Sequence, residues 1–136
     1  MNELTIKARL ENLSKVLDFV DGFLMSLDCS PKIQTQIDLA VEETFVNVAN
    51  YAYAPGTGPV TVQVEELADP TAVQITFIDE GKPFDPTAKA DPDVTLPAEE
   101  RQIGGLGIFM VKKTMDDMRY EYKDNQNVLT IRKVIG

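Results

Sequence analysis

The sequence predicts an α+β sandwich in which three helices cover one face of a mixed, mostly antiparallel sheet. Three observations support this fold class. Alternating apolar residues mark five strands, apolar residues at every third or fourth position mark three helices, and short turns join consecutive strands. The chain has 136 residues, of which 43% are hydrophobic, so we expect a single domain with one core over residues 1–136.

The first half of the chain is expected to form one strand and two helices. Apolar residues alternate with polar ones over residues 4–8, as in a half-buried strand, and recur every three or four positions over residues 12–27, as in an amphipathic helix. Ser30 then provides a helix N-cap, and Pro31 occupies the first helical position, where a missing N–H costs nothing. A second helix is therefore expected from Pro31 to about Tyr51.

The second half is expected to contain two antiparallel strand pairs and one helix. Alternation over residues 60–64 and 73–78 predicts the first pair. Residues 82–103 show no periodicity and include four prolines, and a loop of this length is typical of a functional lid or a disordered segment. A helix is expected over residues 104–115, followed by a final hairpin over residues 118–134.

The composition excludes several classes of function. Asp and Glu total 22 against 13 Lys and Arg, so the formal charge is −9, and such a chain should repel nucleic acids and anionic membranes. The sequence contains no His and a single cysteine, Cys29, which excludes a Ser-His-Asp triad, an intramolecular disulfide and a Cys/His zinc site. It shows no signal peptide and no long apolar run, so we expect a cytoplasmic protein.

One face of the second helix carries a group of polar residues. Glu43, Asn47 and Asn50 follow one another at spacings of four and three, so their side chains project from the same side of the helix. This face is either simply solvated, or it pairs a carboxylate that acts as a base with an amide that holds a metal ion.

Two further segments combine glycine with groups that bind ligands. The strand over residues 73–78 ends at Asp79, two residues before Gly81, which is either an ordinary turn or a carboxylate placed to accept a hydrogen bond from an exocyclic amine. Residues 104–107 read Gly-Gly-Leu-Gly and open a helix. They form either a flexible hinge or a turn whose free N–H groups, at the helix N-terminus, bind phosphate.

In type and order, these three motifs resemble those of the Bergerat nucleotide-binding fold of the GHKL, or histidine-kinase-like, ATPases. Residues 43–53 resemble the family pattern Glu-x-x-x-Asn-x-x-x-His followed by Ala-Tyr, with Tyr51 in the position of the His. The resemblance is nearest to the small bacterial anti-sigma factor serine/threonine kinases and extends over nearly the whole chain. It implies a two-layer α/β sandwich that uses ATP and Mg²⁺.

The resemblance also implies roles for the motif residues. Glu43 would be the base for an attacking hydroxyl, Asn47 would hold Mg²⁺, and Asn50 would contribute to cofactor binding. Asp79 would bind the adenine amine, and Gly81 would line the base pocket.

The remaining implied contacts involve the ATP lid, expected at about residues 82–104, and the last strand. Arg101 would approach the γ-phosphate, and Thr130 would reach the base pocket. Backbone N–H groups of the glycine-rich turn would bind the phosphates, those of Gly105 and Gly107 in particular. The four residues of this turn are Gly104, Gly105, Leu106 and Gly107.

The implied function is that of a kinase that phosphorylates a small anti-sigma antagonist protein and sequesters a sigma factor. Two alternatives stay open: a non-catalytic switch whose affinity for a partner depends on nucleotide, and an ATPase domain related to histidine kinases, against which the absence of His counts. Relatives act as dimers, and the apolar residues of the first strand and first helix serve either a homodimer interface or the core.

Overall fold

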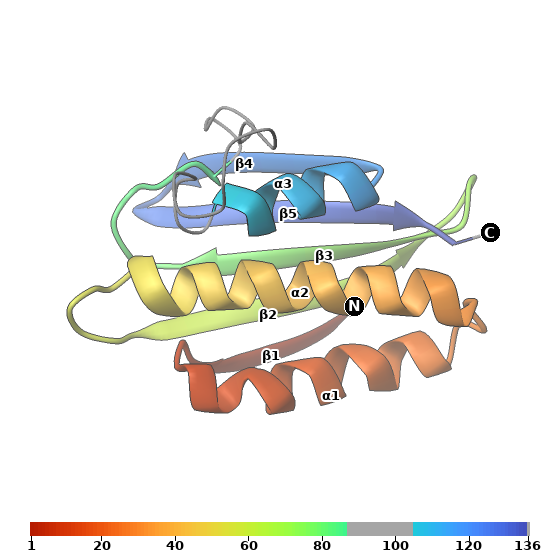
Figure 1. The fold of residues 1–136 in the computed structure, drawn as a ribbon, viewed down its shortest axis with the longest axis horizontal. Coiled ribbons are helices and arrows are strands. Elements are labelled where there is room, and N and C mark those ends of the chain that lie inside the picture. The colour runs from red at the N-terminus through yellow and green to blue at the C-terminus, as the bar shows by residue number, and fades with distance from the viewer. Residues whose placement is uncertain (87–104, 136) are drawn as a thin grey trace.

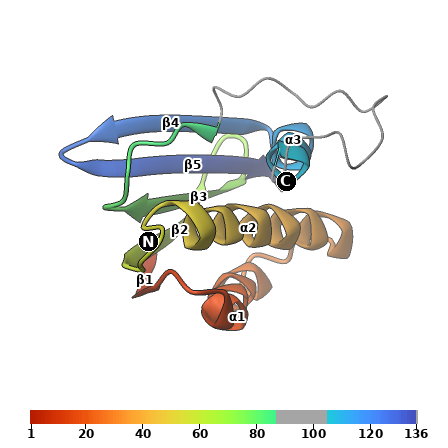
Figure 2. The same ribbon diagram turned by 60° about the vertical axis from the view of Figure 1, so that its left-hand side comes forward.

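The computed structural model describes residues 1–86 and 105–135, and within these ranges the chain forms two layers (Figure 1). Five strands make one sheet in the order β1-β2-β3-β5-β4, and three α-helices cover one of its faces (Figure 2). The expected α+β sandwich is confirmed, but every strand pairing is antiparallel where we expected a mixed sheet. The elements are β1 (Asn2–Lys7), a 3-10 turn η1 (Leu10–Asn12), α1 (Leu13–Met25), α2 (Pro31–Tyr51), β2 (Pro59–Leu67), β3 (Ala72–Asp79), α3 (Gly105–Thr114), β4 (Asp117–Lys123) and β5 (Gln126–Val134).

Helix α2 begins and ends where the sequence predicts. The backbone of Ser30 is extended, and its Oγ accepts a hydrogen bond from the N–H of Ile33 at 3.3 Å, with Pro31 at the first helical position. This cap satisfies an N–H group that a helix start otherwise leaves unpaired. One stripe of α2 packs into the core and so fixes the rotation of the helix. Its buried residues are Ile37, Ala40, Val41, Thr44, Phe45 and Val48.

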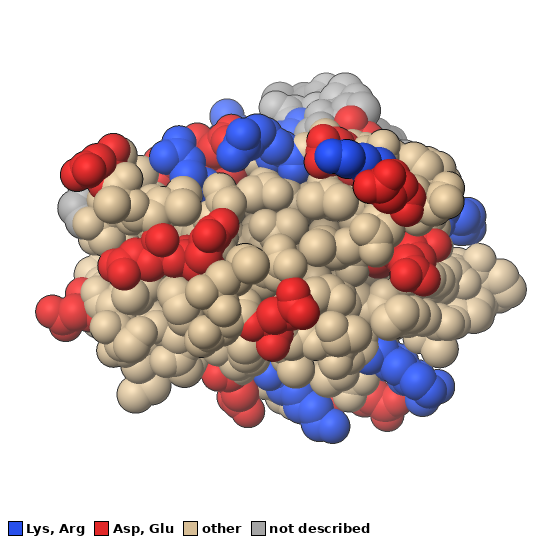
Figure 3. Space-filling model, turned by 180° about the vertical axis from the view of Figure 1, so that it is seen from behind, with Lys and Arg blue, Asp and Glu red and all other residues tan. Residues whose placement is uncertain are grey.

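The core lies between the helices and the inner face of the sheet. Alternation along β2, β3 and β5 turns their apolar side chains toward the helices. Leu4 and Ile6 of β1 pack against the same core as Val16 of α1, so the core accounts for apolar residues that we also considered for a dimer interface. No described helix covers the outer face, where uncharged residues dominate and acidic side chains lie across the middle (Figure 3).

The hairpin of β4 and β5 sets the register on which the site depends. Asp124 and Asn125 form its two-residue turn with φ values of 55° and 62°, a left-handed conformation that Asp and Asn adopt more readily than most residues. Strand β5 then pairs with β3 and places Asn127 directly opposite Asp79. Two polar residues thus meet at one end of an otherwise apolar inner face.

Two carboxyl groups meet where α1 packs on α2. Asp21 accepts a hydrogen bond from Nε2 of Gln34 at 3.3 Å and is also hydrogen-bonded to Asp38. Burial, and then the hydrogen bond and charge of Asp21, raise the pKa of Asp38 from the usual 3.8 to about 7. The folded protein therefore holds a proton that the unfolded chain releases, so this pair destabilises the fold increasingly as the pH rises from about 3.8 to about 7.

We expect Asp38→Asn to raise the melting temperature relative to the native chain at pH 8 and to change it little near pH 4, because the amide is neutral at both. Thermal unfolding followed by circular dichroism at the two pH values measures this difference. Asp18→Asn, at an exposed position of α1, is the matched control and should change the melting temperature by the same amount at pH 4 and at pH 8. Equal effects of Asp38→Asn at pH 4 and pH 8 would show that Asp38 is not protonated in the fold.

Candidate functional site

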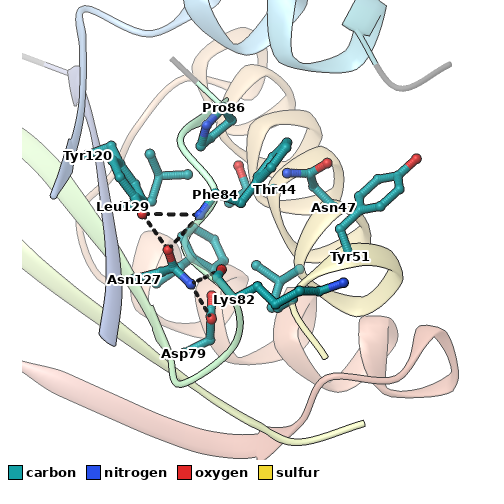
Figure 4. A pocket seen from close by; sticks show the side chains of 13 residues that line it. Thr44, Asn47, Tyr51, Asp79, Lys82, Phe84, Pro86, Tyr120, Asn127 and Leu129 are labelled. Atoms are coloured by element: carbon teal, nitrogen blue, oxygen red, sulfur yellow. Dashed lines mark hydrogen bonds between the residues drawn. The ribbon is translucent and has the colours of Figure 1, made fainter. Parts of the chain in front are cut away.

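Asp79 is a buried carboxylate at the end of β3, 5% exposed. Its Oδ1 accepts two hydrogen bonds, from the backbone N–H of Gly81 at 2.8 Å and from Nδ2 of Asn127 at 2.9 Å (Figure 4). Within the described residues its Oδ2 accepts none, so the carboxylate keeps one acceptor for a ligand. The side chain is held in place by the same two bonds, which fix its orientation before any ligand arrives.

Asn127 joins Asp79 to the segment that follows β3. Besides Asp79, its Nδ2 donates to the carbonyl of Lys82 at 2.8 Å, and its Oδ1 accepts from the backbone N–H of Phe84 at 3.1 Å and from the hydroxyl of Tyr120 (Figure 4). Both ends of the amide are therefore occupied by protein groups. Asn127 acts as a structural link between β3, β5 and the start of the expected lid.

Close packing against the end of α2 holds the turn after Asp79. The hydroxyl of Tyr53 donates to the carbonyl of Pro59 at 2.6 Å and accepts from the backbone N–H of Glu80 at 2.7 Å. A Cβ on Gly81 would overlap the backbone carbonyl of Ala52, which cannot move aside as a flexible side chain could. Gly81 therefore permits the close approach of two backbones, and it does not itself line the cavity described next.

A cavity opens beside Asp79, between α2 and the inner face of the sheet. Most of its lining is apolar (Figure 4). The ring of Phe84 stacks on that of Tyr51 with centroids 6.1 Å apart, which forms part of its rim. The lining residues are Thr44, Asn47, Val48, Tyr51, Ala52, Phe77, Asp79, Lys82, Phe84, Pro86, Tyr120, Asn127 and Leu129.

Glu43 lies against the first turn of α3. A Cβ on Gly107 would overlap its carboxylate, so a glycine at this position lets α2 and α3 approach each other. Burial, and then the charge of Glu42, raise the pKa of Glu43, which makes it a stronger base than an exposed glutamate. Asn47 lies one helical turn after Glu43 and lines the cavity. Helix α2 therefore places a carboxylate beside the first turn of α3 and an amide in the wall of the cavity.

Two residues that we expected to contact the nucleotide, Thr130 at the base pocket and Asn50 elsewhere, do not line the cavity. Thr130 points to the outer face of β5, where its Oγ1 is 3.5 Å from that of Thr76, because alternation along the strand turns it away from Asn127. Asn50 is exposed on α2 and does not line the cavity.

The glycine-rich turn is described only in part. Helix α3 begins at Gly105, and Leu106 and Gly107 lie in its first turn, where backbone N–H groups have no partner within the helix. Most of the expected lid, residues 87–104, lies outside the described residues. This range includes two of the expected site residues, Arg101 and Gly104.

Several residues of the cavity were missed by the sequence reasoning. Asn127 is the clearest case, because it is a polar residue in the buried half of the alternation that continues with Leu129 and Ile131. A polar side chain at the end of such a series is a signal for an inward-facing group. Phe84 and Tyr120 carry no comparable signal, since Phe84 lies in the aperiodic segment after β3 and Tyr120 is one of two tyrosines that alternate along β4.

Comparison with known proteins identifies the family. The model of the histidine kinase-like ATPase domain matches residues 6–133 of the chain. The chain belongs to this family. This histidine kinase-like ATPase domain is 28% identical over 131 residues to the serine-protein kinase RsbW of Halalkalibacterium halodurans, with 93% of the chain and 78% of RsbW covered. It is 24% identical over 102 residues to the serine/threonine-protein kinase BtrW of Bordetella bronchiseptica, with 75% and 71% covered.

Two solved structures share the fold. The RsbU and RsbW domains of Rv1364c from Mycobacterium tuberculosis align with a TM-score of 0.67 at 16% identity, covering 99% of this chain and 33% of that longer chain. A chain of the SiaB–SiaC complex from Pseudomonas aeruginosa aligns with a TM-score of 0.56 at 16% identity, covering 97% and 89%. The expected resemblance to histidine-kinase-like ATPases is confirmed, and the relatives are named as serine kinases.

The cavity of this histidine kinase-like domain combines one buried carboxylate with mostly apolar walls. Asp79 offers a free acceptor oxygen beside apolar walls, which suits an exocyclic amine on a flat ring. Among the described residues no three His, Cys, Asp or Glu side chains come together to bind a metal. The amide oxygen of Asn47, which lines the cavity, is of the type that binds Mg²⁺ together with phosphate oxygens of a nucleotide. None of the described helices has the length and apolar character needed to span a bilayer.

Proposed function

We propose that this chain is an ATP-dependent protein serine/threonine kinase that phosphorylates a small antagonist protein, and that it also sequesters a sigma factor. One observation carries the proposal: Glu43 lies against the first turn of α3, one helical turn from Asn47 at the rim of the cavity that contains Asp79. In the proposed roles, Glu43 is the general base, Asn47 holds the metal ion, and the Asp79 carboxylate binds the nucleobase. The named activity of the RsbW and BtrW relatives supports the same reaction.

In the proposed reaction, Asp79 accepts a hydrogen bond from the adenine amine and positions the nucleotide. The N–H groups at the start of α3 bind phosphate oxygens. Glu43 takes the proton of the acceptor hydroxyl as the hydroxyl oxygen bonds to the γ-phosphorus, and the bond to the β–γ bridging oxygen breaks to release ADP. Mg²⁺, when bound through Asn47, offsets part of the phosphate charge.

The net charge of −9 is compatible with ATP as the substrate. Backbone N–H groups and Mg²⁺ neutralise phosphates without a cluster of basic side chains. The acidic surface instead favours a basic face on the protein partners. A chain of similar fold occurs in the SiaB–SiaC complex, which supports a protein partner.

The experiment that tests the proposal combines the purified chain, γ-labelled ATP, Mg²⁺ and the candidate antagonist encoded nearby. Transfer of label to a Ser or Thr of the antagonist is the expected result. Binding of ATP without any transfer would instead favour a nucleotide-dependent switch. The link from Asp79 through Asn127 to Lys82 and Phe84 is the observation that favours the switch, because a ligand on Asp79 would act on the segment after β3.

Gly107→Ala tests the contact between α2 and α3. The added Cβ displaces the flexible end of Glu43, so we expect transfer to fall by up to about 10²-fold, since small misplacements of a base are costly. The fold should be retained or gain stability, because alanine is favoured over glycine within helices by about 1 kcal/mol. Initial rates of transfer and melting temperatures measure the two effects.

Gly22→Ala is the matched control for this variant, because Gly22 lies within α1 and a Cβ there meets nothing within 4 Å. It should raise stability similarly and leave transfer unchanged. Full transfer by Gly107→Ala would mean that Glu43 does not need its position against α3.

A further inference from the structure

Thr44 has a buried hydroxyl without a hydrogen-bond partner. The residue is 1% exposed, and its Oγ1 finds no donor or acceptor among residues 1–86 and 105–135. Threonines in helices normally solve this problem locally. Thr35 of the same helix donates to the carbonyl of Pro31 at 2.9 Å, and Thr114 of α3 donates to that of Met110 at 2.9 Å. The hydroxyl of Thr44 makes no such bond, although the carbonyl four residues earlier is available in any helix.

The position of Thr44 explains where this hydroxyl can find a partner. One stripe of α2 and the residue after it line the cavity beside Asp79 (Figure 4). The residues are Thr44, Asn47, Val48, Tyr51 and Ala52. Thr44 is the first residue of that stripe. Leaving a buried hydroxyl unpaired costs stability, and such a group in a native protein calls for a specific explanation, such as a bound ligand or an ordered water.

We propose that the hydroxyl of Thr44 is a binding group for the purine base, to which it donates a hydrogen bond at a ring nitrogen adjacent to the exocyclic amine. The inference rests on the proposed function, because it assumes that the cavity receives the base of a nucleotide. Asp79 is an acceptor and selects the amine, whereas Thr44 supplies a donor. Together they match adenine, which carries an amine between two ring nitrogens, and they oppose guanine, whose corresponding position is a carbonyl beside an N–H.

Thr44→Val tests this inference, because valine has nearly the same shape and lacks the hydroxyl. The dissociation constant of ATP, measured by isothermal titration calorimetry with the full chain, should rise about 5-fold for the loss of one neutral hydrogen bond. Thr44→Ser keeps the hydroxyl and should bind within about 2-fold of the native chain. Thr35→Val is the matched control on α2, since its hydroxyl is bonded to Pro31, and should leave the affinity unchanged.

The melting temperature of the ligand-free chain gives an independent readout. Thr44→Val should raise it, because the substitution removes an unpaired buried hydroxyl. A purely structural hydroxyl would show the opposite result, a lower melting temperature with unchanged affinity, and this would overturn the inference. Should Thr44→Val not fold, Thr44→Ala provides the same comparison.

Analogues of ATP locate the contact. 1-Deaza-ATP and 7-deaza-ATP each lack one of the two ring nitrogens beside the amine. For the analogue that lacks the nitrogen contacted by Thr44, the native chain and Thr44→Val should bind with equal affinity. If Thr44→Val weakened the binding of both analogues by the same factor as it weakens the binding of ATP, a contact to the ring would be contradicted. If the native chain binds ATP and Thr44→Val binds it as well, only the role of Thr44 is wrong. If the native chain binds no purine nucleotide, the proposed function fails with it.

Discussion

Glu43→Gln is expected to lower phosphoryl transfer by between about 10²- and 10⁴-fold while the affinity for ATP stays within several-fold of the native value. The glutamine keeps the size of the side chain and its place against Gly107, but it cannot take a proton from the acceptor hydroxyl. The burial that raises the pKa of Glu43 makes it a better base, so native transfer should increase as the pH rises through that pKa. Single-turnover transfer and equilibrium nucleotide binding separate the two effects.

Glu42→Gln is the control for this variant, because it makes the same chemical change at the neighbouring position. Glu42 contributes only the smaller of the two effects that raise the pKa of Glu43, so its loss should shift the pH profile of transfer slightly downward and preserve the maximal rate. Native transfer rates in Glu43→Gln would show that another group acts as the base. A large loss of ATP affinity would show instead that the carboxylate serves binding.

The local signals in the sequence account for most of the elements. Ser30 and Pro31 place the start of α2 because capping depends on neighbouring residues alone, and the alternation along β3 predicts that Asp79 ends a buried strand. The antiparallel character of the whole sheet was not predictable, because strand order depends on contacts between segments far apart in the chain.

The site was predicted less completely than the fold, for the same reason. Thr130 and Asn127 are three residues apart and so lie on opposite faces of β5, and only the pairing with β3 shows that Asn127 is the one beside Asp79. Thr44 was overlooked because it falls within an apolar stripe, where a threonine looks like any other core residue. Its lack of a partner is visible only once the neighbouring atoms are in place.

Asp79→Asn is expected to weaken nucleotide binding by roughly 10- to 100-fold, the loss that follows from removing a hydrogen bond to a charged group. The amide oxygen can still accept from Gly81 and Asn127, so the turn after β3 and the fold should persist. The amide nitrogen then replaces Oδ2 and presents a donor to the amine of the base, which is also a donor. Calorimetric titration with ATP measures the loss, and unfolding curves confirm that the chain remains folded.

Asp69→Asn provides the matched control, because Asp69 lies in the turn between β2 and β3 with a φ of 55°, a conformation that asparagine adopts readily. It should leave both stability and affinity close to native values. The analogue purine riboside triphosphate, which lacks the exocyclic amine, sharpens the comparison, since it should bind the native chain and Asp79→Asn about equally. A 10- to 100-fold difference that persisted with this analogue would mean that Asp79 acts by shaping the cavity, because a carboxylate that reads the amine has nothing to recognise once the amine is gone.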